Sequence, residues 1–493
     1  MSKQIKVLFV AAEVAPLVKV GGLGDVAGSL PYALKSLSPE DNGGHTVDIR
    51  LVLPFHIVLR KKISDPKFLF SFNIPTKDEP INANIFYTMI NEIPTYLIAG
   101  KPIDDAPLVY SSDANIDGYK YTFFSMAILP LIKELKWRPD ILHANDWHTA
   151  LAVYNLKKRR SSDSFFKDIR SILTVHNLPF MGAGTDAAFD AFGISPSRYP
   201  RVPGWGRKFP LPLGLQTADR ISTVSPTYAE EMLTPEYGCG LEKLLQTRKK
   251  VVSGIVNGLD QESWNPATDQ HIPENFDTTH LSKRKQNRHA IIKEFQLDPD
   301  PSVPLLILIS RMDQQKGVDI AVEGLSEIIE KKWQAILLGT GNPELETSCL
   351  ELEEEHPDRV RAVIRFDAAL ARRMYAGGDI LLMPSRYEPC GLAQMMGMRY
   401  GCVPLARATG GLKDTIIDVV NSPKTGTGFL FGPAKAAAFA KAVISSLNIY
   451  KDQDQWKQMQ IRGMNQDFSW KKSALNYIEL FLLVLGKNFA GSN

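Results

Sequence analysis

Cysteine is scarce in this chain, and long apolar runs are missing. The 493 residues contain four cysteines, none in a CxxC pair, namely Cys239, Cys349, Cys390 and Cys402. Such wide spacing implies neither a zinc site nor a disulfide framework. No apolar run reaches the roughly 18–20 residues that are needed to span a bilayer. We therefore expect a protein without a membrane partner.

The chain also has little net charge. It contains 57 Lys and Arg against 54 Asp and Glu, which leaves a formal charge of +3. Binding to a phosphate backbone needs a concentrated basic patch, so this balance argues against a nucleic-acid partner. Hydrophobic residues make up 44% and charged residues 23%, as in an ordinary globular enzyme.

The N-terminus resembles a signal peptide only briefly. Lys3 and Lys6 precede the apolar residues 7–12, but Glu13 interrupts the run and no small-residue cleavage site follows. We expect the first strand of a fold here, and a cytoplasmic protein.

Short aliphatic runs alternate with helical patterns throughout the chain. This pattern is typical of parallel sheets that are covered by helices on both faces. The clearest expected strands are residues 5–12, 47–53, 141–143, 171–176, 304–310, 334–338, 360–365, 379–384 and 402–406. The chain is therefore predicted to be α/β, with two Rossmann-like domains in succession.

A stretch rich in Asn, Asp, Pro and Gln, residues 258–301, separates the two halves, and we place the hinge near its beginning. The predicted domains are residues 1–258 and 259–465, followed by a segment, 466–493. Ligands bind beyond the carboxyl ends of parallel strands, so polar residues there are expected to line a cleft between the domains.

The first candidate site is KVGGLGD, residues 19–25, between the first strand and a helical pattern. Gly21, Gly22 and Gly24 would let backbone amides approach an anion at a helix N-terminus, and Lys19 adds a positive charge. The motif matches neither GxGxxG nor GxxxxGK[ST], which disfavours NAD and ATP. A flexible strand-to-helix turn is the alternative.

Three further motifs follow strands in the second half. Arg311 and Lys316 lie in RMDQQKG (311–317), where two cations beside a glycine suit a diphosphate leaving group. SRYEPCGL (385–392) places the amides of Gly391 and Leu392 at a helix start and Glu388 where it could bind sugar hydroxyls. The turn Thr409, Gly410, Gly411 suits phosphate or sugar contacts.

Taken together, these motifs resemble the bacterial glycogen synthase and plant starch synthase family. The matching segments span nearly the whole chain in the family's order: KVGGLGD (19–25), HANDWH (143–148), TVHN (174–177), STVSPTY (222–228), IVNGLD (255–260), RMDQQKG, SRYEPCGL, TGG (409–411) and FSW (468–470). The resemblance implies a GT-B fold, two Rossmann domains around a cleft, with C-terminal helices that return to the first domain.

It also implies a retaining glucosyltransferase that extends an α-1,4-glucan from ADP-glucose or UDP-glucose, without a cofactor. Arg311, Lys316, Lys19 and its neighbouring glycines would hold the diphosphate. Glu388, Gly391 and Leu392 would hold the donor glucose, His176 would lie beside it, and Asp146 would orient the acceptor hydroxyl. The remaining donor-binding candidates are Asp25, Asn257, Tyr375, Cys390, Thr409, Gly410 and Gly411, with Tyr375 stacking on the base.

No divalent metal is expected, because Arg311 and Lys316 neutralise the diphosphate. We interpret the carboxylate pairs at 298/300 and 452/454 as loop residues, His143 and His148 as hydrogen-bonded histidines, and Cys390 as a packing residue. The family favours front-face attack, in which the departing phosphate helps to deprotonate the acceptor.

Two segments depart from the family. Residues 109–121 lack the usual Tyr-Gly, Asp-Asn and Arg-Phe pairs, and LPFMG (178–182) replaces the common AYQG. Both should border the acceptor path. The alternatives are another GT-B enzyme with a small-molecule acceptor and an inactive glucan-binding homologue. Met396 stands where many other GT-B enzymes carry a second Glu, which favours the synthase family.

Overall fold

The computed structural model describes residues 3–487, and the chain divides into two compact units. The first unit runs to Gly258 and takes up the chain again from Trp470, while Leu259–Ser469 forms the second. Each unit is a twisted sheet with helices packed on it, so the predicted α/β class with two Rossmann-like domains is confirmed.

The first unit is built on a nine-stranded sheet. In spatial order its strands are β3 (Lys67–Ile74), β4 (Ile81–Ile90), β5 (Ile93–Ala99), β2 (His45–Pro54), β1 (Lys3–Val10), β6 (Ile141–Asn145), β7 (Arg170–Val175), β8 (Arg220–Thr223) and β9 (Val252–Gly254). From β5 to β9 all pairs are parallel, whereas β3, β4 and β5 form an antiparallel meander.

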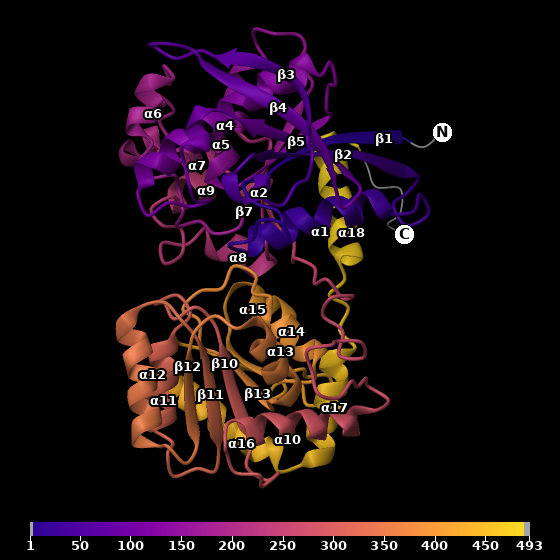
Figure 1. The fold of residues 1–493 in the computed structure, drawn as a ribbon, viewed down its shortest axis with the longest axis vertical. Coiled ribbons are helices and arrows are strands. Elements are labelled where there is room, and N and C mark those ends of the chain that lie inside the picture. Colours follow the sequence, from indigo (N-terminus) through magenta and orange to yellow (C-terminus); the bar gives the residue numbers. More distant parts are fainter. Residues whose placement is uncertain (1–2, 488–493) are drawn as a thin grey trace. The chain divides into compact units, whose positions relative to one another are not determined.

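The helices of the first unit include one from the end of the chain. They are α1 (Gly22–Ser36), α2 (Ile57–Arg60), α3 (Lys101–Asp104), α4 (Ala114–Glu134), α5 (Trp147–Arg159), α6 (Asp186–Ala191), α7 (Pro210–Thr217), α8 (Pro226–Glu231), α9 (Glu242–Thr247) and α18 (Trp470–Val484). Figure 1 shows α18, in yellow, beside the indigo α1, with which it packs. Tyr477 and Phe481 of α18 are buried in the core of this unit, as the resemblance implied.

The second unit has a six-stranded parallel sheet. Its strands in spatial order are β12 (Val360–Ile364), β11 (Gln334–Gly339), β10 (Leu305–Ile309), β13 (Ile380–Met383), β14 (Val403–Arg407) and β15 (Phe429–Phe431). Its helices are α10 (Arg284–Glu294), α11 (Val318–Ser326), α12 (Pro343–Glu355), α13 (Ala368–Gly377), α14 (Ala393–Arg399), α15 (Gly410–Thr415), α16 (Ala436–Tyr450) and α17 (Gln453–Met464).

Both faces of this second sheet are buried. Along β10, Leu306 and Leu308 pack in one hydrophobic cluster, and Leu305 and Ile307 pack in another. Successive side chains of a strand point to opposite faces, so each cluster lies on its own face of the sheet. This explains why the strands of this unit read as continuous aliphatic runs.

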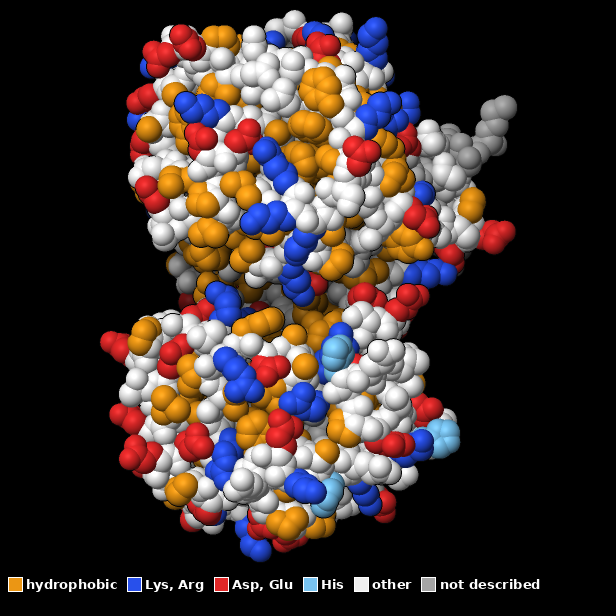
Figure 2. Space-filling model, in the orientation of Figure 1, with side chains coloured by type: hydrophobic (Ala, Val, Ile, Leu, Met, Phe, Trp, Pro, Cys, Tyr) orange, Lys and Arg blue, Asp and Glu red, His pale blue; other side chains and the backbone are white. Residues whose placement is uncertain are grey.

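On the surface, Lys and Arg side chains are interspersed with Asp and Glu over the visible face of each unit (Figure 2). Within residues 3–487, no helix has both the length and the apolar character needed to cross a membrane.

Candidate functional site

The predicted glycine loop lies between β1 and α1. Helix α1 begins at Gly22, and Gly21 is its N-cap residue, so the loop amides lie at a helix N-terminus as expected. The Lys19 side chain extends to the first turn of α1, where its Nζ lies 2.8 Å from Oδ1 of Asp25. Its side chain keeps 48% of its surface exposed, which leaves the ammonium accessible to an anion.

Glu13 holds this loop in place through hydrogen bonds. In the sequence it marked only the end of an apolar run. Its side-chain oxygen Oε2 accepts hydrogen bonds from the backbone N–H groups of Val20, at 2.5 Å, and Gly21, at 3.0 Å. Its Oε1 accepts one from the Tyr110 hydroxyl, at 2.9 Å. Burial raises the pKa of the Glu13 carboxyl, and these hydrogen bonds oppose the rise. A carboxylate directly after the apolar run of the first strand was the available signal.

Asp146 and His176, predicted from separate motifs, lie together at the carboxyl ends of β6 and β7. Oδ1 of Asp146 accepts a hydrogen bond of 2.7 Å from the backbone N–H of His176. The His176 Nε2 lies 2.9 Å from Oδ1 of Asn145, the residue before Asp146. The geometry therefore fixes the carboxylate and the imidazole relative to each other.

The backbone of Asp146 is strained. Its φ of 56° and ψ of −173° lie in a region that residues with a side chain rarely adopt. Strain of this kind persists only where the surrounding structure enforces it, and it concentrates at functional sites. The observation independently marks Asp146 as a functional candidate.

Burial shifts the protonation of both groups. It raises the pKa of Asp146 to about 7, against the hydrogen bonds from the backbone of His176 and Asn177. It lowers the pKa of His176 to about 3, so this imidazole is neutral near pH 7. The negative charge of Glu13 further raises the pKa of Asp146. Glu13 therefore influences both the glycine loop and the Asp146–His176 pair.

The two histidines of the HANDWH segment, His143 and His148, are packing residues. The His143 Nε2 lies 2.7 Å from the Thr174 hydroxyl, and its ring contacts Phe9 edge-on. His148 is buried against Tyr121 and Trp147. The expected hydrogen bond is present for His143, whereas Nδ1 of His148 has no hydrogen-bond partner among residues 3–487.

Asn257 lies in the segment after β9 and is buried. Its Oδ1 has no hydrogen-bond partner among residues 3–487. A buried acceptor of this kind normally finds a partner. The side-chain oxygens of Asn177, Gln216 and Gln394 share this property, so it does not by itself mark Asn257 as a ligand-binding residue.

In the second unit, the structure brings Lys316 and Glu388 into direct contact. The Lys316 Nζ lies 2.8 and 2.6 Å from the two carboxylate oxygens of Glu388, and the Ser385 hydroxyl donates to Oε2 at 3.0 Å. These residues, with Arg311, line a cavity of about 190 Å³ at the carboxyl ends of β10 and β13. The Arg311 side chain is 66% exposed, and its Nη1 lies 3.0 Å from Asp313.

The Thr409–Gly411 turn packs directly on the segment that holds Glu388. The Gly411 N–H donates to the carbonyl of Glu388 at 3.1 Å. Gly410 has a φ of 43°, and a Cβ on it would lie 2.0 Å from that same carbonyl oxygen. Glycine is therefore required at position 410 to bring the two predicted motifs together.

Helix α14 begins directly after the SRYEPCGL segment, with Leu392 as its N-cap residue. Gly391 precedes it with a φ of 71°, a left-handed conformation that favours glycine. The expected placement of these amides at a helix start is thus observed. Cys390 is buried in the turn, in agreement with its interpretation as a packing residue.

Tyr375 does not occupy the position that was expected of a residue stacking on a nucleotide base. It is 3% exposed on α13, and its ring contacts Trp264 and Tyr400 edge-on and tilted, respectively. An exposed aromatic residue, Phe366, follows the carboxyl end of β12 and is 86% exposed. Phe366 was not among the residues predicted from the sequence, although an aromatic residue directly after a strand was a usable signal.

The carboxylates that could suggest a metal site serve local structure. Asp300 accepts hydrogen bonds from the backbone and hydroxyl of Ser302, and Asp298 accepts from the backbone of Asp300. Asp452 is the N-cap of α17 and accepts from the Gln455 N–H at 3.0 Å. Turn and capping roles account for these residues.

Two protein families match consecutive parts of the chain. Residues 6–247 match the starch synthase catalytic domain, and residues 291–462 match glycosyl transferases group 1. Glycogen synthase from Geotalea daltonii is 39% identical over 98% of this chain and 99% of its own length. Glycogen synthase from Thermotoga maritima is 38% identical, again over 98% of this chain and 99% of its own length.

Solved structures show the same similarity. The catalytic domain of starch synthase IV from Arabidopsis thaliana, bound to ADP and acarbose, superposes with a TM-score of 0.86 at 30% identity. The alignment covers 98% of this chain and all of that domain. Sucrose-phosphate synthase from Thermosynechococcus elongatus shares the fold, with a TM-score of 0.58 at 18% identity over 98% of this chain and 99% of its own.

Proposed function

The chain belongs to the glycogen and starch synthase family of hexosyltransferases, and we propose from this premise that its donor is ADP-glucose. Its activity is that of a glycogen or starch synthase, which adds glucose from a nucleotide sugar to a glucan. The ADP in the Arabidopsis starch synthase structure supports adenine over uracil, with UDP-glucose as the alternative. The acceptor is proposed to be the non-reducing end of an α-1,4-glucan.

Arg311 and Lys316 are proposed to bind the donor diphosphate in the second unit. Both line the cavity beside Glu388 at the carboxyl edge of the sheet. Negative charge grows on the diphosphate as the glycosidic bond breaks, and fixed cations stabilise that charge at no cost of reorganisation. Lys19, Gly21 and Gly22 are proposed as further donor-binding residues, because the turn combines a cation with a helix N-terminus. The Gly22 amide is the one proposed to contact the diphosphate, since the Gly21 amide donates to Glu13.

Glu388 is proposed to hold the donor glucose, together with the amides of Gly391 and Leu392. Both of its carboxylate oxygens accept hydrogen bonds from Lys316, which reduces its strength as a nucleophile. Hydrogen bonds to sugar hydroxyls remain available to the outer lone pairs of the carboxylate. The contact with Lys316 is the single observation that carries this proposal, because it joins the sugar-binding and diphosphate-binding groups.

Asp146 and His176 are proposed to act on the acceptor side. The neutral His176 imidazole can exchange hydrogen bonds without adding a charge next to the sugar. The Asp146 carboxyl, with its pKa near 7, can accept a hydrogen bond from the acceptor hydroxyl and orient it.

We propose front-face transfer with retention of configuration. Two successive displacements would need a carboxylate nucleophile about 5–5.5 Å from an acid/base partner. Glu388 is already paired with Lys316, which supports the single-step alternative. The departing phosphate oxygen then takes the acceptor proton. No divalent metal is proposed, because Arg311 and Lys316 supply the positive charge.

Phe366 is proposed to stack on the nucleotide base in place of the buried Tyr375. Its exposed ring follows β12, the edge strand that pairs with β11, and every base offers a face for stacking.

Radiolabelled ADP-glucose and UDP-glucose, each offered with glycogen, with fructose or without acceptor, test the function. We expect label in precipitable glucan, faster from ADP-glucose, and unchanged in the presence of EDTA. Label that enters only a small molecule would favour a different GT-B transferase, and no transfer at all would favour an inactive glucan-binding homologue. The presence of Lys19, Arg311, Lys316 and Glu388 supports an active enzyme.

A further inference from the structure

Lys120, on α4, is a buried cation that the proposed function does not use. Its side chain is 0% exposed. Its Nζ donates to Oδ1 of Asp117 at 2.7 Å and to the carbonyls of Leu108 and Val109 at 3.0 and 2.7 Å. An ammonium group has three protons to donate, so all of its hydrogen-bonding capacity is used within the chain. Because two of the three acceptors are main-chain carbonyls, Lys120 ties α4 to the segment that precedes it.

The segment between α3 and α4 depends on side chains for its conformation. Among residues 3–487, the backbone N–H groups of residues 108–113 donate to no main-chain carbonyl. A helix or a strand would supply such bonds from its own backbone. The contacts of Lys120 with Leu108 and Val109 therefore stand in for main-chain hydrogen bonds.

Two further residues of α4 hold the same segment. The Tyr121 hydroxyl donates to the Val109 carbonyl at 2.5 Å, and Oδ2 of Asp117 accepts from the Ser111 N–H at 2.8 Å. Side chains three and four positions apart lie on one face of a helix. We call the three residues of this face the α4 clamp: Asp117, Lys120 and Tyr121. The clamp contacts the chain on both sides of position 110.

Tyr110 is the residue between these contacts, and it leads to the glycine loop. Its hydroxyl donates to Oε1 of Glu13 at 2.9 Å. The other carboxylate oxygen, Oε2, accepts from the backbone N–H groups of Val20 and Gly21. A continuous series of contacts therefore runs from the α4 clamp, through Tyr110 and Glu13, to the loop before α1.

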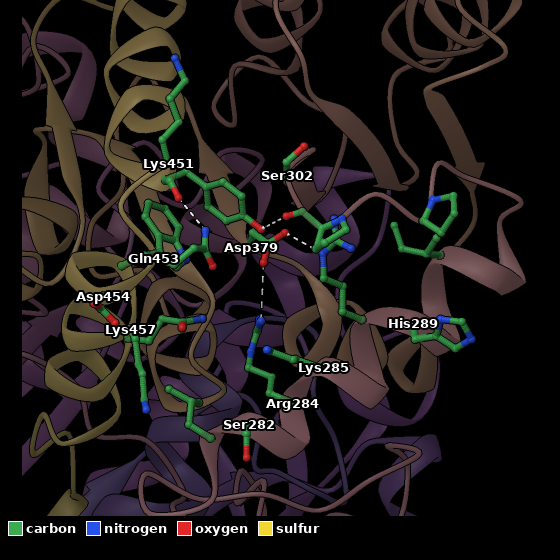
Figure 3. Close-up of a pocket in the computed structure, with 18 residues that line it drawn as sticks. Ser282, Arg284, Lys285, His289, Ser302, Asp379, Lys451, Gln453, Asp454 and Lys457 are labelled. Carbon is green, nitrogen blue, oxygen red and sulfur yellow. Dashed lines mark hydrogen bonds and ion pairs between the residues drawn. The ribbon is translucent and has the colours of Figure 1, made fainter.

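Arg284, on α10, shows that a buried cation can also serve the fold alone. Its guanidinium donates to the carbonyls of Tyr400 and Tyr375, at 2.9 and 3.2 Å, and its Nη1 lies 3.8 Å from Oδ1 of Asp379 (Figure 3). Asp379 directly precedes β13, so this group lies at the amino end of that strand, away from the candidate site. Lys120 differs from Arg284 because the segment that it holds leads to a candidate ligand-binding loop.

We propose that Lys120 is a positioning residue for the nucleotide sugar, which acts on the glycine loop through Tyr110 and Glu13. The inference rests on the proposed function, in which Lys19 and the Gly22 amide contact the donor diphosphate. Lys120 is fully buried, so it acts only through the groups that it holds. Without its ammonium, Tyr110 is no longer held against Glu13, and the loop loses its fixed geometry. A displacement of about 1 Å is enough to impair ligand positioning strongly.

Calorimetric titration of the full chain with ADP tests the inference without requiring turnover. Lys120→Met should weaken ADP binding by about 5-fold, because the loop that contacts the diphosphate loses its support. Tyr121→Phe removes one hydroxyl and no charge, and it should weaken ADP binding by about 2-fold. Tyr121→Phe therefore decides the question if Lys120→Met does not fold.

The effect of Lys120→Met should depend on Glu13, which distinguishes positioning from a purely structural role. In protein that carries Glu13→Ala, Lys120→Met should weaken ADP binding by less than about 1.5-fold, because its route to the loop is already broken. A structural role would lower the midpoint of thermal unfolding without changing the ADP affinity of the folded protein. An equal loss of affinity with and without Glu13 would show that Lys120 acts by another route, and would overturn the proposal.

Lys133→Met is the matched control. Lys133 lies in the last turn of the same helix and pairs with Asp163 at 2.6 Å, so its replacement removes a Lys–Asp pair outside the α4 clamp. It should leave the ADP affinity within about 1.5-fold of wild type. If Glu13→Ala weakens ADP binding but Lys120→Met and Tyr121→Phe do not, this inference fails while the proposed donor loop stands. If Glu13→Ala also leaves ADP binding unchanged, both the donor loop and the inference are wrong.

Discussion

Lys316 and Glu388 form an ion pair that joins two loops of the second sheet. The Nζ of Lys316 lies within 2.8 Å of both carboxylate oxygens, and the two side chains are 20% and 7% exposed. The backbone of Arg386 also donates to the carbonyl of Gln315, at 2.8 Å, so the loops are tied by main chain as well. Replacing either Lys316 or Glu388 should therefore leave the charge of the other without its partner.

Glu388→Ala should reduce glucosyl transfer by at least about 10²-fold, because it removes the group proposed to hold the donor glucose. Lys316→Ala should reduce it similarly and also destabilise the fold by roughly 2 kcal/mol, since it leaves a buried carboxylate unpaired. The variant with both Lys316→Ala and Glu388→Ala should lose less unfolding free energy than the sum of the losses in the two single variants. Steady-state kinetics and urea unfolding measure both effects.

Glu294→Gln is the control, because it breaks the more exposed Arg373–Glu294 pair of the same unit. It should change neither turnover nor, by more than about 0.5 kcal/mol, the free energy of unfolding. Near-wild-type turnover of Glu388→Ala would show that the donor site was assigned wrongly.

Glu13→Ala should raise the KM for the nucleotide sugar by about 10-fold, because the amides of Val20 and Gly21 lose their acceptor and the loop loses its fixed geometry. Glu13→Gln retains one acceptor oxygen and should recover part of this loss. Tyr110→Phe removes only the hydroxyl donor and should have the smallest effect. A wild-type KM for Glu13→Ala, measured on protein of unchanged thermal stability, would contradict a positioning role.

Asp146→Asn should stabilise the protein above pH 7 while it lowers transfer. Burial raises the pKa of the Asp146 carboxyl from 3.8 to about 7, so the folded protein holds this proton to a higher pH than the unfolded chain. The stability linked to that proton is present below about pH 4 and is lost as the pH rises through 7. Asparagine carries no charge, so above pH 7 the free energy of unfolding of Asp146→Asn should exceed that of wild type by roughly 4 kcal/mol.

The difference between Asp146→Asn and wild type should therefore shrink as the pH falls and vanish below about pH 4. Urea unfolding across this range measures it. Asp168→Asn serves as the control, because the Asp168 side chain is 69% exposed and its replacement should shift stability little at any pH. A stability difference for Asp146→Asn that does not depend on pH would rule out the buried-charge explanation.

The buried strands were predictable because both faces of each sheet are covered. Aliphatic runs such as residues 304–310 and 334–338 agree with β10 and β11 to within a residue or two. Strand β3 was not predicted, because its positions are mostly exposed or partly buried and it carries no continuous aliphatic run. Its place at the edge of the sheet explains this pattern.

The position of a candidate residue was predictable where its motif follows a strand, as for Lys316 and Glu388. The role of Glu13 depends on how residues 14–21 fold back over it, which no local pattern encodes. Tyr375 was assigned from the family resemblance, but the side of α13 that it occupies faces the core. Helix orientation, rather than residue type, decides that difference.

Phe366→Ala should raise the KM for ADP-glucose by about 10-fold with little change in kcat, since base stacking on an aromatic ring is worth about 1–3 kcal/mol and is equal in the ground and transition states. Phe366→Tyr should retain the KM, because the ring is preserved. Tyr375→Phe, which keeps the packing of the buried ring, should leave the KM unchanged as well. Steady-state kinetics test this assignment: a wild-type KM for Phe366→Ala would show that the base does not stack on Phe366.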